Sequence, residues 1–173
     1  MTDMSPVDDF DTMPAYEMMA RREAAEQETA LLIGQFLFAY SRFVTATHLA
    51  VAWVGGGAAL DAHRERARGY SVSDLLKALR ARANAQLASG SDDLSRYTSW
   101  CDRADVLRAT RNDIAHARWG MEAYGRCAIA VTTPVLVEPA RQREFTVAQL
   151  DGLCSACSEL VDELFALRED FPL

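Results

Sequence analysis

The sequence of 173 residues has little positive charge and almost no lysine. It contains 18 lysine and arginine residues, of which Lys77 is the only lysine, against 25 aspartate and glutamate residues, so its formal charge is −7. A negative total argues against a protein that coats nucleic acid without regard to sequence, because such binding depends on excess positive charge. The scarcity of lysine beside abundant arginine and alanine fits a coding bias and carries little functional weight.

Targeting and membrane signals are also lacking. The N-terminus has no basic stretch followed by an apolar run, so a signal peptide is not expected. The apolar stretch at 30–54 is interrupted by Gln35, Arg42 and His48, which favours a buried helix over a membrane span. We therefore expect a cytoplasmic protein that makes no membrane contact and keeps its four cysteines reduced.

Several motifs that would define an enzyme class are incomplete. The three glycines at 55–57 are not followed by the Gly-Lys-Ser/Thr of a phosphate-binding loop. Cys154 and Cys157 form a CxxC, but no second ligand pair or βαβ context accompanies it, so we interpret both as core thiols. No Ser–His–acid or Cys–His arrangement follows from the spacing. The sequence therefore predicts neither a bound metal nor a cofactor.

Apolar periodicity predicts an all-α fold, with residues 1–20 as a flexible acidic N-terminal arm and residues 21–173 as a single domain. We expect four helices and a hairpin, at about 20–54, 73–87, 92–117 and 147–168 for the helices and at about 119–133 for the hairpin. The predicted helix caps are Ser71 or Ser73, Ser91 or Asp92, and Thr146.

Residues 61–70 are predicted to be a basic connection, and the apolar run 135–137 between two prolines fits no single element. Short connections between the helices favour an up-down four-helix bundle, with a short β-hairpin insertion between helices three and four. The first helix carries two apolar stripes, one with Phe36 and Phe43 and the other with Leu37 and Val44. Two stripes exceed what one packing partner needs, so we expect contact with a second subunit.

The reactive side chains gather near the end of the third helix. Arg111, Asn112 and His116 lie within six residues, inside the segment 61–126, where twelve bases outnumber nine acids. At 100° per residue, Arg111 falls about 40° from the apolar stripe centred on Leu107, whereas Asn112 and His116 share another edge at about 140° and 180°. A guanidinium on an apolar stripe is costly unless it is paired or lies beside a wet cleft.

Together these groups suit binding of a phosphate and transfer of a proton without a metal. Arg108, Arg118 and Trp119 flank the motif and are candidate substrate contacts, although Trp119 is better suited to packing than to stacking on a base. A purely structural interpretation stays open. In it, Arg111 pairs with an acid on the last helix, Glu159 or Asp162, and His116 caps free carbonyl groups.

The sequence Arg-Asn-x-x-x-His at the end of the third helix resembles the Arg-x(4–6)-His signature of the HEPN superfamily. The resemblance covers about residues 28–168 and includes the long first helix and a closing helix that begins Phe145-Thr146-Val147. It implies an all-α bundle that dimerises, with two motifs facing each other across a cleft. Many members are metal-independent endoribonucleases of toxin–antitoxin or phage-defence systems, in which a ribose 2′-OH attacks the neighbouring phosphate.

Carried over to this chain, the resemblance implies that His116 transfers protons, Arg111 stabilises the charge of the phosphorane, and Asn112 helps to orient His116 or the phosphate. It also implies a homodimer, RNA as substrate and a possible antitoxin protein as partner. One branch of the family has a tyrosine two residues after the histidine, where a partner enzyme modifies it. Arg118 stands there in this chain, so that regulation is not expected. Some relatives bind without cleaving, so the alternative is a non-catalytic HEPN-like RNA-binding, regulatory or interaction module.

Overall fold

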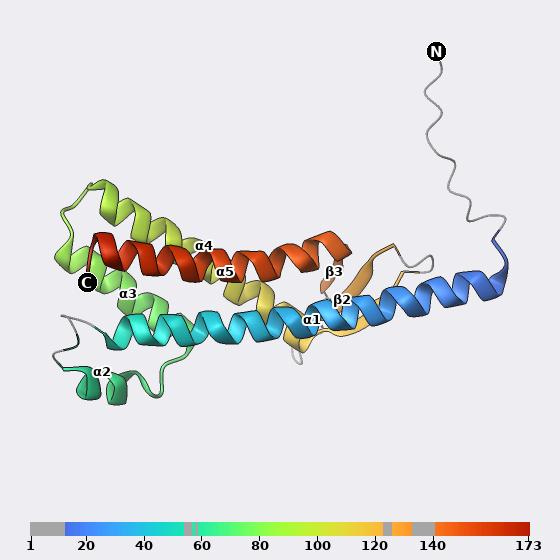
Figure 1. Ribbon diagram of the computed structural model, residues 1–173, viewed down its shortest axis with the longest axis horizontal. Helices are drawn as coiled ribbons and strands as arrows, with labels where there is room; N and C mark the ends of the chain where they lie inside the picture. The colour runs from blue at the N-terminus through green and yellow to red at the C-terminus, as the bar shows by residue number, and fades with distance from the viewer. Residues whose placement is uncertain (1–12, 54–56, 58, 123–125, 133–140) are drawn as a thin grey trace, which may run out of the picture.

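Helices account for most of the chain, and a small antiparallel sheet lies between the last two of them (Figure 1). The computed structural model describes residues 13–53, 57, 59–122, 126–132 and 141–173. The helices there are α1 (Ala15–Ala52), α2 (Leu60–Ala67), α3 (Val72–Gln86), α4 (Asp92–His116) and α5 (Val147–Asp170), and the strands are β1 (Arg118–Met121), β2 (Ala128–Thr132) and β3 (Arg141–Phe145). The predicted, mostly helical fold is confirmed.

Three of the helices begin at residues that the sequence singles out as caps. The Ser71 hydroxyl accepts from the backbone N–H of Asp74 at the start of α3, and the Thr146 hydroxyl does the same for Gln149 at the start of α5. Both helices complete a capping box, in which the third residue bonds back to the cap. Ser91 caps α4 in the same way, without that return bond. These local hydrogen bonds fix where each helix starts.

The boundaries of two predicted segments differ from the structure. Helix α1 begins at Ala15, so residues 15–20 belong to the helix and not to the flexible arm, because no helix breaker follows Pro14 and proline is tolerated at a helix start. Residues 1–12, the rest of the predicted arm, lie outside the described residues. The predicted connection at 61–70 contains the two-turn helix α2, whose only buried residue is Ala67. A helix with so small an apolar face has no periodicity to reveal it.

The predicted hairpin is part of a larger sheet. Strands β1 and β2 pair antiparallel, and β3 adds to the other side of β2 in the order β1-β2-β3. In this register Phe145 at the end of β3 lies opposite Ala128 at the start of β2. The unassigned run at 135–137 lies outside the described residues. Strand β3 has the sequence Arg-Gln-Arg-Glu-Phe, in which only Phe145 is apolar, so its pairing with β2 identifies it rather than any apolar alternation.

The strict up-down order expected from the sequence is not observed. Helices α1 and α5 run in the same direction in Figure 1, and an Arg168 guanidinium N–H near the end of α5 donates to the Trp53 carbonyl at the end of α1 over 3.1 Å. Helix α3 also follows the direction of α1, because its Arg82 donates to the Val51 carbonyl over 3.1 Å. Among the four long helices, only α4 runs in the opposite direction. Its Tyr97 hydroxyl near the start donates to the Phe171 carbonyl after the end of α5 over 2.9 Å.

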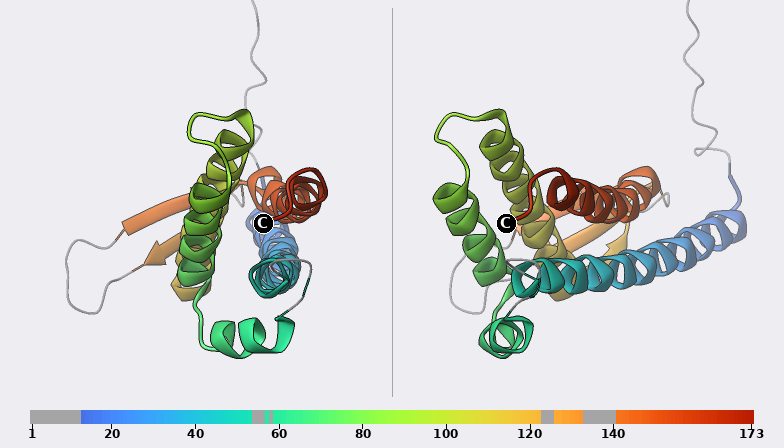
Figure 2. Two further views of the ribbon diagram at one scale, coloured as in Figure 1. Left: turned by 90° about the vertical axis from the view of Figure 1, so that its left-hand side faces the viewer. Right: turned by 60° about the vertical axis from the view of Figure 1, so that its left-hand side comes forward.

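The short helix α2 explains this order. Helix α2 and residues 68–71 carry the chain back along α1, so that Ser71 lines one groove with Tyr40 and Val44 of α1. Helix α3 then starts again in the direction of α1. Helices α3 and α4 form an antiparallel pair that is set at an angle to the parallel pair α1 and α5 (Figure 2). A simple short turn in place of α2 would have given the antiparallel neighbour that the sequence suggests.

The core lies where α1, α4 and α5 meet around Trp100. This side chain is fully buried, its ring packs against Phe43 with a centroid distance of 6.1 Å, and its indole N–H donates to the Leu160 carbonyl over 2.8 Å. Within α1, an 18-residue window is apolar enough to cross a membrane by length and composition, a test that core helices of soluble proteins also pass. The burial of Phe36 and Phe43 against α4 and α5 agrees with the predicted core stripe.

Replacing Trp100 by alanine should remove both the packing and the indole hydrogen bond at this junction. We expect a loss of about 3–5 kcal/mol in the free energy of unfolding, the usual range for a large buried aromatic residue. Chemical denaturation monitored by circular dichroism measures it. Val106→Ala on the same helix is the control, because Val106 is 68% exposed and should change stability by less than about 0.5 kcal/mol. Equal midpoints for both variants would contradict the central role of Trp100.

Candidate functional site

An open groove of about 610 Å³ lies between α1, the start of α3 and the second half of α4. Arg111 and Asn112, two of the three predicted catalytic residues, line it together with Arg108. The opposite walls carry hydroxyl groups and apolar side chains, supplied by Tyr40, Ser41, Ser71 and Ser73 and by Leu37, Val44 and Val72. The groove therefore combines two guanidinium groups with neutral hydrogen-bonding groups and an apolar surface.

Arg111 lines the groove, and no carboxylate of the described residues pairs with it. Its guanidinium carbon lies 5.5 Å from the centre of the Tyr40 ring, and its Nη1 donates to the Asn112 side-chain oxygen over 3.3 Å. Its Nε is buried and has no hydrogen-bond acceptor among the described residues. Neither Glu159 nor Asp162, the acids that the structural interpretation would pair with it, forms an ion pair with Arg111 in the described part of the chain. The guanidinium charge is therefore available to a ligand.

Tyr40 forms the surface on which this guanidinium rests. Its side chain is only 6% exposed, and it packs between Phe36 and Phe43 in a row of aromatic rings along α1. Burial raises the pKa of the Tyr40 hydroxyl, while the charges of Arg111 and Arg108 oppose that rise. The hydroxyl thus stays protonated and can donate to a ligand. Sequence reasoning assigned Tyr40 no role in the site, because its link to Arg111 crosses 71 positions of the chain.

Arg108 adds a second positive charge one turn before Arg111. Its Nε donates to the Asp105 carboxylate over 2.7 Å. The hydrogen bond from Arg108 holds the pKa of Asp105 below its ordinary value, and the same bond raises the pKa of Arg108. Asp105 does not line the groove, but its carboxylate orients Arg108 and offsets part of its charge.

His116 lies one turn beyond Asn112, at the last residue of α4. Its side chain is exposed, and it accepts or donates no hydrogen bond within the described residues. It does not line the groove. The structure therefore brings Arg108, Arg111 and Asn112 together in the groove. His116 lies outside the groove, at the C-terminal end of α4. Asn112 bonds to Arg111, a contact that the sequence did not predict. It forms no hydrogen bond to His116 among the described residues, so its expected role of orienting the imidazole is not seen.

Trp119 takes a different position from that of a base-stacking residue. Its indole N–H donates to the Ile114 carbonyl near the end of α4 over 3.1 Å, and its ring packs against Phe145 of β3 at a centroid distance of 5.6 Å. This packing is the role that the sequence favours for Trp119. The indole also satisfies a carbonyl at the end of α4, the task that the structural interpretation gave to His116. Arg118, the neighbouring candidate, is exposed on β1.

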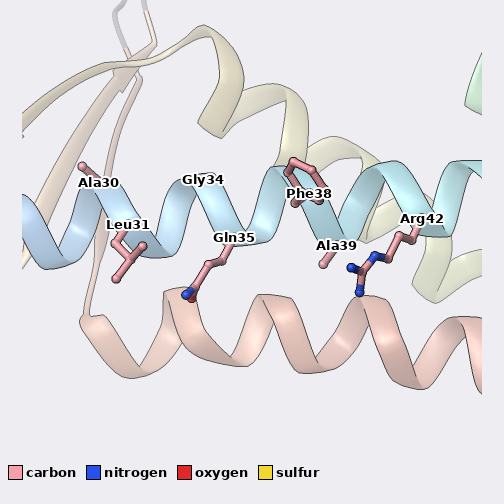
Figure 3. Close-up of a pocket in the computed structure, with 7 residues that line it drawn as sticks. All are labelled: Ala30, Leu31, Gly34, Gln35, Phe38, Ala39 and Arg42. Carbon is pink, nitrogen blue, oxygen red and sulfur yellow. The ribbon is translucent and has the colours of Figure 1, made fainter.

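A second hollow lies on the outer face of α1, away from these groups (Figure 3). Phe38 is 73% exposed and Leu31 is 61% exposed. Gly34 lies between them and has no side chain to fill the hollow. Arg42 is the only ionisable residue that lines this hollow, so it has no acid or base for catalysis. The predicted second stripe, Leu37 and Val44, is instead half-buried against the bundle. Leu31 and Phe38, seven residues apart on one helix face, are the signal that sequence reasoning missed.

The described residues contain no group of three or more histidine, cysteine, aspartate or glutamate side chains suited to a metal ion. All four cysteines are free. Burial raises the pKa of Cys101 to about 11 and that of Cys157 to about 12. A thiol that stays protonated is a poor nucleophile and a poor metal ligand. Cys157 of the CxxC is therefore a core residue, and Cys154 is half-buried beside it.

No family model, no curated protein and no solved structure matches this chain. The site is therefore interpreted from its own residues and from the resemblance of the Arg111–His116 motif.

The burial of the thiols predicts their order of reaction. In the folded protein near pH 8, iodoacetamide should modify Cys127 and Cys154 well before Cys101 and Cys157, because the latter two are buried and their raised pKa values keep them protonated. Mass spectrometry of quenched samples measures the order. In urea all four thiols should react at similar rates, which is the internal control. Early labelling of Cys157 in the folded protein would show that the CxxC is a reactive site after all.

Proposed function

We propose that this protein is a metal-independent endoribonuclease of the HEPN type, which acts as a cytoplasmic homodimer in a toxin–antitoxin or phage-defence system. In this proposal the four long helices α1, α3, α4 and α5 correspond to the four helices of the HEPN bundle. Helix α2 and the three-stranded sheet are additions to it, and the helix directions depart from a strict up-down order. The partner protein of such a system would be an antitoxin.

One observation carries this proposal more than any other: Arg111 lines an open groove and forms no ion pair within the described part of the chain. A half-buried guanidinium with an unpaired Nε is costly for folding alone. A phosphate group supplies the acceptors that such a guanidinium lacks, and it does so through paired, charge-assisted hydrogen bonds. The neighbouring Asn112 and Arg108 extend the same set of donors.

The chemistry follows from these donors and from the imidazole. The ribose 2′-oxygen forms a bond to the adjacent phosphorus as its proton passes to a base, and the bond from phosphorus to the 5′-oxygen breaks as that oxygen gains a proton. The products are a 2′,3′-cyclic phosphate and a 5′-OH end. His116 has the side chain for these transfers near neutral pH. In a dimer, two copies of it divide the roles of base and acid. Arg111 balances the extra negative charge of the phosphorane.

The outer face of α1 supports the dimer. Exposed Leu31 and Phe38 form an apolar surface on a helix, and such surfaces on soluble proteins often mark interaction sites. Ser41 lines both the groove and a hollow between α1 and α5 that also contains Phe38. The apolar face and the groove are therefore neighbours around α1. A second subunit bound to Phe38 would lie close to the edge of the groove.

The position of His116 favours a second candidate function. Its side chain is exposed and lies outside the groove, whereas Arg108 and Arg111 lie within it. A protein of this kind would bind RNA through the groove without cutting it, as a regulatory or interaction module.

Cleavage in EDTA tests the proposed activity. The wild-type protein should cut mixed RNAs without a metal and leave 2′,3′-cyclic phosphate ends. His116→Ala should lower the rate by about 10²–10⁴-fold, the usual contribution of a general acid or base, and Arg111→Ala by about 10²–10³-fold. His48→Ala removes a histidine outside the groove and should leave the rate unchanged. Equal rates for the wild type and His116→Ala, or no cleavage by either, would overturn the ribonuclease proposal.

Dimer formation is tested at Phe38. Phe38→Glu places a charge in the centre of the apolar face and should convert a dimer into a monomer in light scattering after gel filtration, with a parallel loss of cleavage. Val106→Glu on α4 is the matched control, because its exposure of 68% is close to the 73% of Phe38. A wild-type protein that is already monomeric, or a Phe38→Glu variant that stays dimeric, would exclude this face as the interface.

A further inference from the structure

We propose that the groove between α1, the start of α3 and α4 is a nucleotide-binding site that is complete within one subunit and holds a phosphate flanking the bond that is cut. The idea that the ligand is RNA rests on the proposed function. The existence of the site does not, since the groove includes neither His116 nor a second subunit. None of its lining residues carries a carboxylate. Asp105 and Asp74 offset part of the positive charge from outside the lining, because they bond to Arg108 and Ser71 respectively, whereas Arg111 has no such partner among the described residues.

The start of α3 brings a third source of positive polarity to the two arginines. Val72 and Ser73 line the groove, and their backbone N–H groups have no acceptor among the described residues. The Ser71 hydroxyl is engaged with Asp74, since it accepts from the Asp74 N–H and donates to the Asp74 carboxylate over 2.6 Å. The Asp74 carboxylate also accepts from the Ser71 N–H, so this capping box leaves the N–H groups of Val72 and Ser73 free. The first N–H groups of a helix point along its axis and favour an anion. Arg108 and Arg111 face this helix start from α4 across the groove.

Tyr40 gives an independent indication of a ligand. Its side chain is more than nine-tenths buried and lines the groove, and its hydroxyl, which keeps contact with solvent there, has no hydrogen-bond partner among the described residues. Buried polar groups in folded proteins nearly always have a partner. The buried Nε of Arg111, stacked over the same ring, also lacks one. Two unpartnered donors at one groove mark a place where acceptors are expected, and a phosphate carries several oxygen acceptors.

The shape of the groove favours a nucleotide over a bare phosphate ion. Its volume of about 610 Å³ lies within the range of about 300–1,000 Å³ of small-molecule sites. Apolar Leu37, Val44 and Val72 supply a surface for a sugar or base beside the charged groups. Along α4, Arg108 and His116 are separated by a rise of about 12 Å. An extended single strand of RNA spans that separation. One of its phosphates then lies at Arg108 while another reaches His116.

A charge placed at Ser73 tests the site. Ser73→Asp puts a carboxylate in the groove at the second residue of α3, where an acid also favours the helix itself. We expect it to weaken binding of a fluorescein-labelled, single-stranded 2′-O-methyl RNA about tenfold or more, because the new carboxylate repels the phosphate at contact distance. Fluorescence anisotropy with the full-length protein measures the Kd. The 2′-O-methyl group prevents cleavage, so binding is read alone.

Two control variants isolate the cause. Ser73→Asn has the size of the aspartate without its charge and should bind as the wild type does. Ala148→Asp makes the same charge change at the second residue of α5, which also begins with a capping box, and should leave the Kd within about twofold. If Ser73→Asp fails to fold in circular dichroism, Arg108→Gln replaces it and should weaken binding in the same assay. Equal binding by Ser73→Asp and Ala148→Asp, or by Arg108→Gln and the wild type, would overturn the proposal.

Competition separates the two sources of phosphate. A 5′-mononucleotide should displace the labelled RNA at a lower concentration than inorganic phosphate does, because only the nucleotide can use the apolar wall. Equal competition would overturn the nucleotide assignment in favour of a free phosphate. The site and the catalytic proposal fail separately. If the protein does not cleave RNA but Ser73→Asp weakens binding, the site stands and the ribonuclease proposal fails. If the protein cleaves RNA and Ser73→Asp leaves the Kd unchanged, only the site proposal fails.

Discussion

The packing of Trp100 against Phe43, with its indole N–H bound to the Leu160 carbonyl, fixes α4 against both α1 and α5. A buried indole N–H needs a hydrogen-bond acceptor, and the Leu160 carbonyl provides that acceptor at one point along α5. This contact sets how far α4 lies along the other two helices. The motif follows on the same rigid helix, eleven residues later. Arg111 consequently meets the ring of Tyr40 on α1, and not an acid of α5.

The groove balances stability against function. The guanidinium of Arg111 gains a cation–π contact and an amide hydrogen bond, which together offset part of the cost of half-burying a charge. The rest is not compensated within the described chain, since the buried Nε of Arg111 lacks a hydrogen-bond partner there. Residues that leave such groups unsatisfied are typical of binding sites. Meanwhile Trp119 satisfies a carbonyl at the end of α4, so His116 has no structural task there.

Much of the local structure could be predicted because its causes are local. Serine and threonine caps, helical spacing of apolar residues and the aromatic stretch after α4 each act over a few residues, and they identified α1, α3, α4, α5 and the first two strands. Helix α2 and β3 escaped prediction for the opposite reason. Helix α2 buries only Ala67, and β3 is specified by its pairing with β2, so neither has an apolar pattern of its own. The return of the chain through α2, in turn, reversed the expected direction of α3.

The sequence by itself determined which groups stand on which face of α4: Arg111 toward the apolar stripe, Asn112 and His116 on another edge. Helical geometry fixes those angles without reference to the rest of the chain. Only the tertiary structure decided what Arg111 faces, because Tyr40 and Ser73 approach it from α1 and α3 after the chain has folded back through α2. It also decided that the groove includes Arg108 and excludes His116. Side chains far apart in the sequence become neighbours only through packing, and helix periodicity carries no information about that packing.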